Sequence, residues 1–179
     1  MRSTRSPFRL RAAAVLTCSV LAVSALPACG GKPAPQTAKV TAGEMPEGES
    51  WNGVYFHPVF GYLHMVEEGD SIIGRWKRTD QSAWGELSGK KQGNLVRYGW
   101  KEHKIGLIGP ASSVSGRGYF KYKEGKEKGI AELDGQFGLD QDETGSDWHC
   151  VKQQRLQPDL KSINGDTGGL APPAGNTWQ

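Results

Sequence analysis

The stretch SIIGRW, Ser71–Trp76, carries the pattern that decides the predicted fold. Gly74 is followed two positions later by Trp76, so both lie on the same face of an extended strand. A large side chain from a neighbouring strand can then lie over the glycine, and the sheet can curl there. The same arrangement recurs in Ser115–Phe120 and in Leu133–Phe137. Its repetition predicts successive strands that curl into a closed or nearly closed barrel.

On both sides of this stretch, short runs of β-branched and aromatic residues alternate with polar ones. Gly, Asp and Ser interrupt these runs about every ten positions, which is typical of an antiparallel meander. We therefore predict an all-β fold, an up-and-down meander of about eight strands. The expected strands are Trp51–Val59, Gly61–Val66, Ser71–Arg78, Ala83–Gly89, Asn94–Lys101, Val114–Lys123, Gly129–Gly138 and Asp147–Gln154. The apolar loop His103–Ser113 is expected to cap one end of the barrel.

The segments that flank this domain differ from it in composition. Residues 29–49 are rich in Pro, Gly and Ala and have almost no large apolar side chains, so we expect a flexible tether. Residues 157–179 are rich in Gly, Pro and Asn, and we expect a disordered tail. The folded domain is thus expected at residues 50–156.

The amino terminus has the character of an export signal. Four arginines lie within the first 11 residues, no acidic residue precedes Glu44, and an apolar run extends over Ala12–Leu26. The run is short for a bilayer span and fits the apolar region of a signal peptide. It ends in the sequence Leu26-Pro27-Ala28-Cys29.

This ending resembles the lipobox of bacterial lipoproteins. The resemblance implies removal of residues 1–28, a diacylglyceryl group on the Cys29 thiol and an acyl chain such as palmitate on the new amino terminus. Two or three chains hold a protein firmly in a lipid bilayer. The residue after the cysteine is Gly30 and not aspartate, and for bacterial lipoproteins this implies sorting to the outer membrane. The domain would then lie on the periplasmic or the outer face of that membrane. The alternative is that Cys29 only ends a secretory leader or an uncleaved helix.

Without the leader, the chain has 18 basic and 19 acidic residues, a formal charge of −1. A near-neutral domain gives no case for binding nucleic acid. The charge is nevertheless uneven, with 13 basic and 5 acidic residues over 71–128 and six acidic residues without a base over 132–147. A basic surface that faces lipid headgroups or an acidic partner is one interpretation, and solvated outward strand faces are the other.

Several aromatic residues are candidates for a ligand site. The opening segments Trp51–Tyr55, Gly61–Leu63 and Ile73–Trp76 resemble the start of small up-and-down barrels of the avidin and lipocalin kind, which implies an interior that can hold a ligand. No polar ligand-binding residue of avidins is traceable here. The candidate wall residues are Trp76, Tyr98, Trp100 and Phe120. They serve equally well as core, because side chains can fill an eight-stranded barrel.

Metal and catalytic motifs are weak. Asp140, Asp142 and Asp147 offer oxygen ligands around a glycine, as calcium requires, but Val151 stands where an EF-hand loop has its bidentate Glu. The alternative is a solvated acidic hairpin tip. The histidines lack zinc-site spacing, and no nucleophile motif is present. We therefore expect no enzyme activity and no cofactor, and Cys150 should pack as a small apolar side chain.

These observations favour a lipoprotein of the bacterial envelope that acts as a non-enzymatic binding or assembly module, held in the bilayer by Cys29 and working with other envelope proteins. The alternative is a carrier of a small apolar ligand. A cavity of several hundred cubic ångströms favours the carrier, and a filled interior with an exposed apolar patch favours the module.

Overall fold

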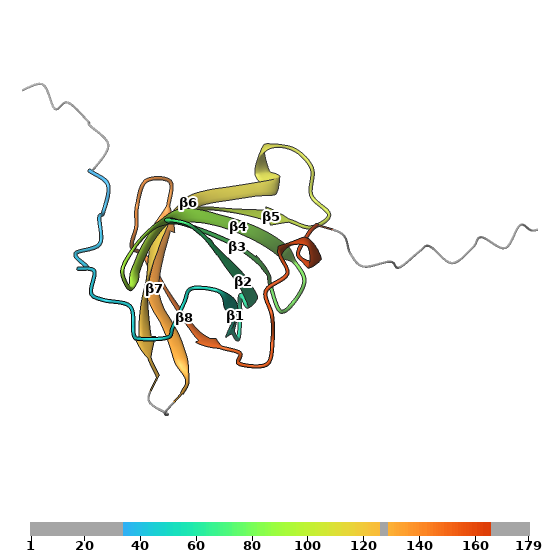
Figure 1. Cartoon of the computed structure of the whole chain (residues 1–179). Helices are drawn as coiled ribbons and strands as arrows, with labels where there is room; N and C mark the ends of the chain where they lie inside the picture. The colour runs from blue at the N-terminus through green and yellow to red at the C-terminus, as the bar shows by residue number, and fades with distance from the viewer. Residues whose placement is uncertain (1–33, 126–128, 166–179) are drawn as a thin grey trace, which may run out of the picture. The chain divides into compact units, whose positions relative to one another are not determined.

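The computed structural model describes residues 34–125 and 129–165, and within them the predicted all-β fold is confirmed (Figure 1). Eight antiparallel strands follow one another around a closed barrel, in which β1 pairs with β8. The strands are β1 Gly53–His57, β2 Gly61–Glu68, β3 Ser71–Lys77, β4 Ala83–Gln92, β5 Leu95–Lys104, β6 Ser113–Glu124, β7 Ala131–Leu139 and β8 Ser146–Lys152. Residues 1–28 and Cys29, on which the lipobox prediction rests, lie outside the described residues.

Glycines give space to large inward rings of neighbouring strands, at Gly135 as the sequence pattern predicts and also at Gly85, which lies outside that pattern. A Cβ on Gly85 would come within 2.1 Å of the Trp76 ring, so the ring lies directly over this glycine of the next strand. Phe120 likewise lies over Gly135, where an added Cβ would come within 2.9 Å of the ring. Each pairing gives a large inward ring the space that a side chain opposite would occupy. Pairing each ring with a glycine on the neighbouring strand lets large aromatic residues fit inside a narrow barrel.

The two ends of the barrel differ. The closed end carries the β2–β3, β4–β5 and β6–β7 turns, and the fully buried Trp51 lies there just before β1. The Trp51 indole donates to the Gly93 carbonyl at 3.3 Å, and its ring meets Tyr122 edge-on at 5.7 Å. The other end, which we call the mouth, carries the β1–β2, β3–β4, β5–β6 and β7–β8 loops.

The β5–β6 loop at the mouth does not cap the barrel. It contains a single 3-10 turn, η1 Pro110–Ser112, and the side chains of Leu107 and Ile108 are exposed. The expectation of a capping loop was therefore wrong. Leu107 and Ile108 face solvent, whereas Ile105 is partly buried.

Residues 34–49 lie against the barrel, where the sequence predicted a free tether over 29–49. We call this segment the strap. Its Gln36 pairs with the β7–β8 loop, since the Gln36 carbonyl accepts from Glu143 N at 2.8 Å. Further along, Gly43 N donates to the Asn94 side chain at 2.7 Å in the β4–β5 turn. The strap therefore runs along the wall from the mouth side toward the closed end (Figure 1).

Part of the predicted disordered tail is also ordered. The 3-10 turn η2 Leu160–Ser162 lies beside β2 and β3, where the His64 ring bonds with the backbone of Asp159 at 3.0 Å. Ile163 is buried, and the described chain ends at Gly165 beside the Trp84 ring. Among residues 34–125 and 129–165, no helix has the length and apolar character that crossing a membrane requires.

Candidate functional site

Aromatic rings fill the barrel interior. Trp148 of β8 lies at the centre of this packing, with its ring centroid 5.1 Å from that of Trp76 and 5.1 Å from that of Phe120. The Cys150 thiol is free and fully buried in the same core, as predicted, and burial raises its pKa far above the ordinary value. A thiol in that state is a poor nucleophile. The interior is thus a packed core over most of its length.

A small pocket opens at the mouth. Its volume is about 150 Å³, which suits one aromatic ring or one side chain rather than a drug-sized ligand. The lining residues are Phe60, Trp76, Arg78, Trp100, Glu102, Val114, Phe137, Leu139 and Trp148. Most of this surface is aromatic or aliphatic, so the pocket favours an apolar group.

An ion pair forms the polar side of the mouth pocket. Glu102 is buried, and its two carboxylate oxygens accept from Arg78 Nε at 2.9 Å and Arg78 Nη2 at 3.0 Å. The Trp76 indole donates to the same carboxylate at 3.3 Å. The bidentate geometry satisfies a charge that would otherwise be costly to bury. Because the charges cancel, the pair gives the pocket no preference for an anion or a cation.

The β1–β2 loop brings Phe60 to the pocket, and His57 holds this loop. His57 Nδ1 accepts from the backbone N–H groups of Val59 at 3.0 Å and Phe60 at 3.1 Å. Burial, with His149 as a smaller cause, lowers the pKa of His57 below its ordinary value. The neutral ring is the form that can accept both hydrogen bonds.

The structure separates the four candidate wall residues into two groups. Trp76 and Trp100 reach the mouth pocket, whereas Tyr98 and Phe120 lie deeper and do not line it. The Tyr98 hydroxyl is buried without a hydrogen-bond partner, and burial raises its pKa. All four residues therefore belong to the core, and Trp76 and Trp100 also line the mouth pocket.

Sequence reasoning missed the charged residues of the mouth. Arg78 and Glu102 each lie two positions after an inward tryptophan, Trp76 and Trp100, so the alternation of the strands directs them inward. That spacing was the available signal.

The acidic β7–β8 loop makes contacts with the strap. Asp142 Oδ1 accepts from Gln36 N at 2.8 Å, and Glu143 pairs with Arg97. Asp140 is exposed, and Asp147 accepts from the Gln136 side chain at 2.8 Å. In the described part of the chain, no group of three or more His, Cys, Asp or Glu residues is placed to hold a metal ion. The loop thus serves as a docking point for the strap.

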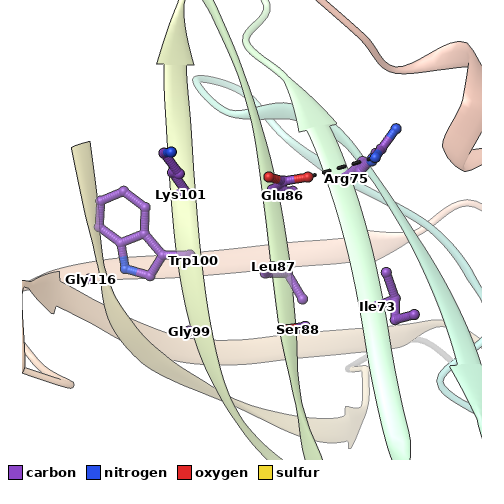
Figure 2. A pocket seen from close by; sticks show the side chains of 9 residues that line it. All are labelled: Ile73, Arg75, Glu86, Leu87, Ser88, Gly99, Trp100, Lys101 and Gly116. Atoms are coloured by element: carbon purple, nitrogen blue, oxygen red, sulfur yellow. Dashed lines mark ion pairs between the residues drawn. The ribbon is translucent and has the colours of Figure 1, made fainter. Parts of the chain in front are cut away.

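A second hollow lies on the outer wall, over β3, β4 and β5 (Figure 2). Its volume is about 400 Å³, and its floor is low because Ser88 and Gly99 face each other across β4 and β5. Arg75 and Glu86 form an ion pair at 3.6 Å on one side, and the exposed Lys101 lies beside them. This outer groove offers both charge signs to a partner.

No family model, curated protein or solved structure matches this chain.

Proposed function

We propose that the protein is a lipid-anchored, non-enzymatic module of the bacterial outer membrane that binds an envelope protein through the outside of its barrel. The filled interior carries this proposal. Because aromatic rings occupy most of the space that a ligand would need, the surfaces left for binding are the outer groove and the mouth.

The outer groove is the part of the wall that best suits a protein partner. Small residues at Ser88 and Gly99 let another chain approach the sheet closely, and a Cβ added at Gly99 would meet no atom nearer than 4.0 Å. The Arg75–Glu86 pair and Lys101 supply charged groups at its edge. Such an arrangement gives specificity through polar contacts around a low floor.

The anchor is supported by the lipobox sequence and is compatible with the strap. Ala34, where the described chain begins, is five positions after Cys29. The strap continues from there along the wall, held by Arg97, whose Nη2 donates to the Ala38 carbonyl at 3.0 Å. The barrel would therefore be held close to the lipid.

A photo-crosslinking amino acid at Ser88, in the groove, tests the binding role in intact envelopes. We expect one discrete protein adduct, identified by mass spectrometry. The matched control is the same amino acid at His149, which is about half exposed on the opposite part of the wall and lies outside the groove. Equal adducts at both positions, or no protein adduct at Ser88, would contradict the proposal.

The second candidate is a carrier of a small apolar ligand, favoured by the mouth pocket alone. A pocket of about 150 Å³ limits such a ligand to roughly the size of benzene. Native mass spectrometry of the protein from its own envelope distinguishes the two candidates. A stoichiometric small molecule that disappears in Trp100→Ala supports the carrier, and the mass of the chain alone supports the module.

A further inference from the structure

The strap places the start of the described chain at the mouth side of the barrel. Gln36 bonds to three consecutive residues of the β7–β8 loop, namely Asp142, Glu143 and Thr144. The connection from Cys29 to Gln36 spans seven residues, which extend to at most about 25 Å. A lipid on Cys29 therefore keeps this edge of the mouth within that distance of the bilayer. The strap contacts are on the barrel itself, so the chain that leads to Cys29 leaves the barrel at the mouth edge and not at the closed end.

The same end of the barrel carries most of the exposed apolar side chains. Large hydrophobic residues that are exposed in the described part of the chain are Val59, Tyr62, Leu107, Ile108, Leu139 and Leu156. All except Leu156 lie in or beside the mouth loops. We call Val59, Leu107, Ile108 and Leu139 the mouth rim. Ile108 is fully exposed at 102%, and the other three are more than half exposed.

We infer that the mouth rim is a second membrane contact, in which these side chains enter the surface of the lipid bilayer that holds Cys29. The inference rests on the proposed anchor, because the anchor sets which end of the barrel approaches the lipid. Apolar side chains gain free energy when they leave water for the acyl boundary. A rim held within reach of that boundary by a short connection has the lipid surface as its nearest apolar partner.

The charges around the mouth indicate that this contact is apolar rather than electrostatic. Pro58–Phe60 and Ile105–Ser112 contain no charged residue. Asp140 follows Leu139 directly, Lys104 precedes Ile105 directly, and both are exposed. Their opposite charges beside the rim offset each other, so they give no preference for anionic lipid. The rim should therefore insert into neutral lipid at least as well as into anionic lipid, and salt should not release it.

The test supplies the anchor chemically, so that it does not depend on lipidation in the cell. The mature chain is coupled through the Cys29 thiol to a maleimide lipid in phosphatidylcholine vesicles, and the buried Cys150 stays unreacted. A fluorescent amino acid sensitive to polarity replaces Ile108 in one protein. In the matched control it replaces Leu156, which is exposed after β8 at the opposite end.

We expect emission from position 108 to shift to the blue when the protein is on vesicles and to be quenched by lipid-borne quenchers. Emission from position 156 should stay as in water. Leu107→Asp should weaken partition of the rim into lipid about tenfold. Vesicles with an equal part of phosphatidylglycerol, and high salt, should give the same blue shift as phosphatidylcholine alone.

Three results would overturn the inference. One is emission as in water at both positions on vesicles. Another is a blue shift that requires phosphatidylglycerol and disappears in salt, which would assign the contact to basic groups elsewhere. The last is a blue shift without vesicles that grows with protein concentration, which would assign the rim to a second copy of the chain. The anchor proposal can fail independently of this test, because the mass of the natural amino terminus shows whether Cys29 carries lipid in the cell.

Discussion

The closed end and the mouth of the barrel both carry large apolar side chains, but these side chains are buried at the closed end and in part exposed at the mouth. At the closed end, Trp51 and Tyr122 are fully buried, and the strap brings Glu49 to bond with the Tyr122 hydroxyl and with Lys152 at 3.2 Å. At the mouth, Leu107 and Ile108 face solvent on a loop with no charged residue. The closed end therefore buries its large side chains, whereas the mouth leaves apolar side chains exposed on a loop.

The largest expected loss in the free energy of unfolding comes from a substitution at the closed end. Trp51→Ala removes a fully buried indole that packs on Tyr122 and donates to Gly93 O. We expect the free energy of unfolding to fall by about 3–5 kcal/mol. Denaturation by urea, followed by circular dichroism, measures this. A loss below about 1 kcal/mol would show that the packing of Trp51 contributes little to the stability of the barrel.

The next effect concerns the buried charge at the mouth. Arg78→Met leaves the Glu102 carboxylate without its counter-ion, so we expect a loss of about 3 kcal/mol in the free energy of unfolding. The double variant Arg78→Met/Glu102→Gln removes both charges and should recover much of this loss. If the single variant is as stable as the double variant, the pair does not act as proposed.

A smaller effect depends on pH. Because the pKa of His57 is lowered in the folded chain, the unfolded chain takes up the proton first as pH falls. The free energy of unfolding should thus fall as pH drops through about 6.5 toward the lowered pKa. His57→Asn keeps an acceptor for Val59 N and Phe60 N and cannot titrate, so it should show a weaker fall. Urea titrations across this range give the comparison, and parallel curves for the two proteins would refute this assignment.

The smallest expected effect lies at the mouth rim. Ile108→Ser should change the free energy of unfolding by no more than about 0.5 kcal/mol, because the side chain is fully exposed. The same urea titration measures this. A loss comparable with that of Trp51→Ala would mean that the rim is part of the core and would remove the contrast between the two ends.

The strands were predictable because their pattern is local. Alternation places Trp76 and Trp100 inside, and each of these rings faces a glycine on the next strand, Gly85 and Gly116. The alternation is visible within a few consecutive residues, and each ring and the glycine that it faces lie on strands that follow one another along the chain. All four candidate wall residues lie in the barrel core, and of these Trp76 and Trp100 reach the pocket.

The strap and the ion pair were not predictable for a different reason. Gln36 bonds to Asp142, 106 positions away, and mainly backbone groups hold it there. Backbone groups carry no sequence signature, so a segment rich in Pro and Gly reads as a free tether. Arg78 and Glu102 are 24 positions apart and each reads as a surface charge until the closed barrel brings them together.

The proposed lipid on Cys29 determines which end of the barrel approaches the bilayer, and the mass of the mature amino-terminal peptide shows whether that lipid is present. The protein is extracted from envelopes with detergent beside a Cys29→Ser variant. We expect the wild type to begin at Cys29, to carry diacylglyceryl and acyl groups, and to sediment with membranes, whereas the variant should be soluble. Wild-type protein that is released into the soluble periplasm with an unmodified Cys29 would contradict the proposed anchor.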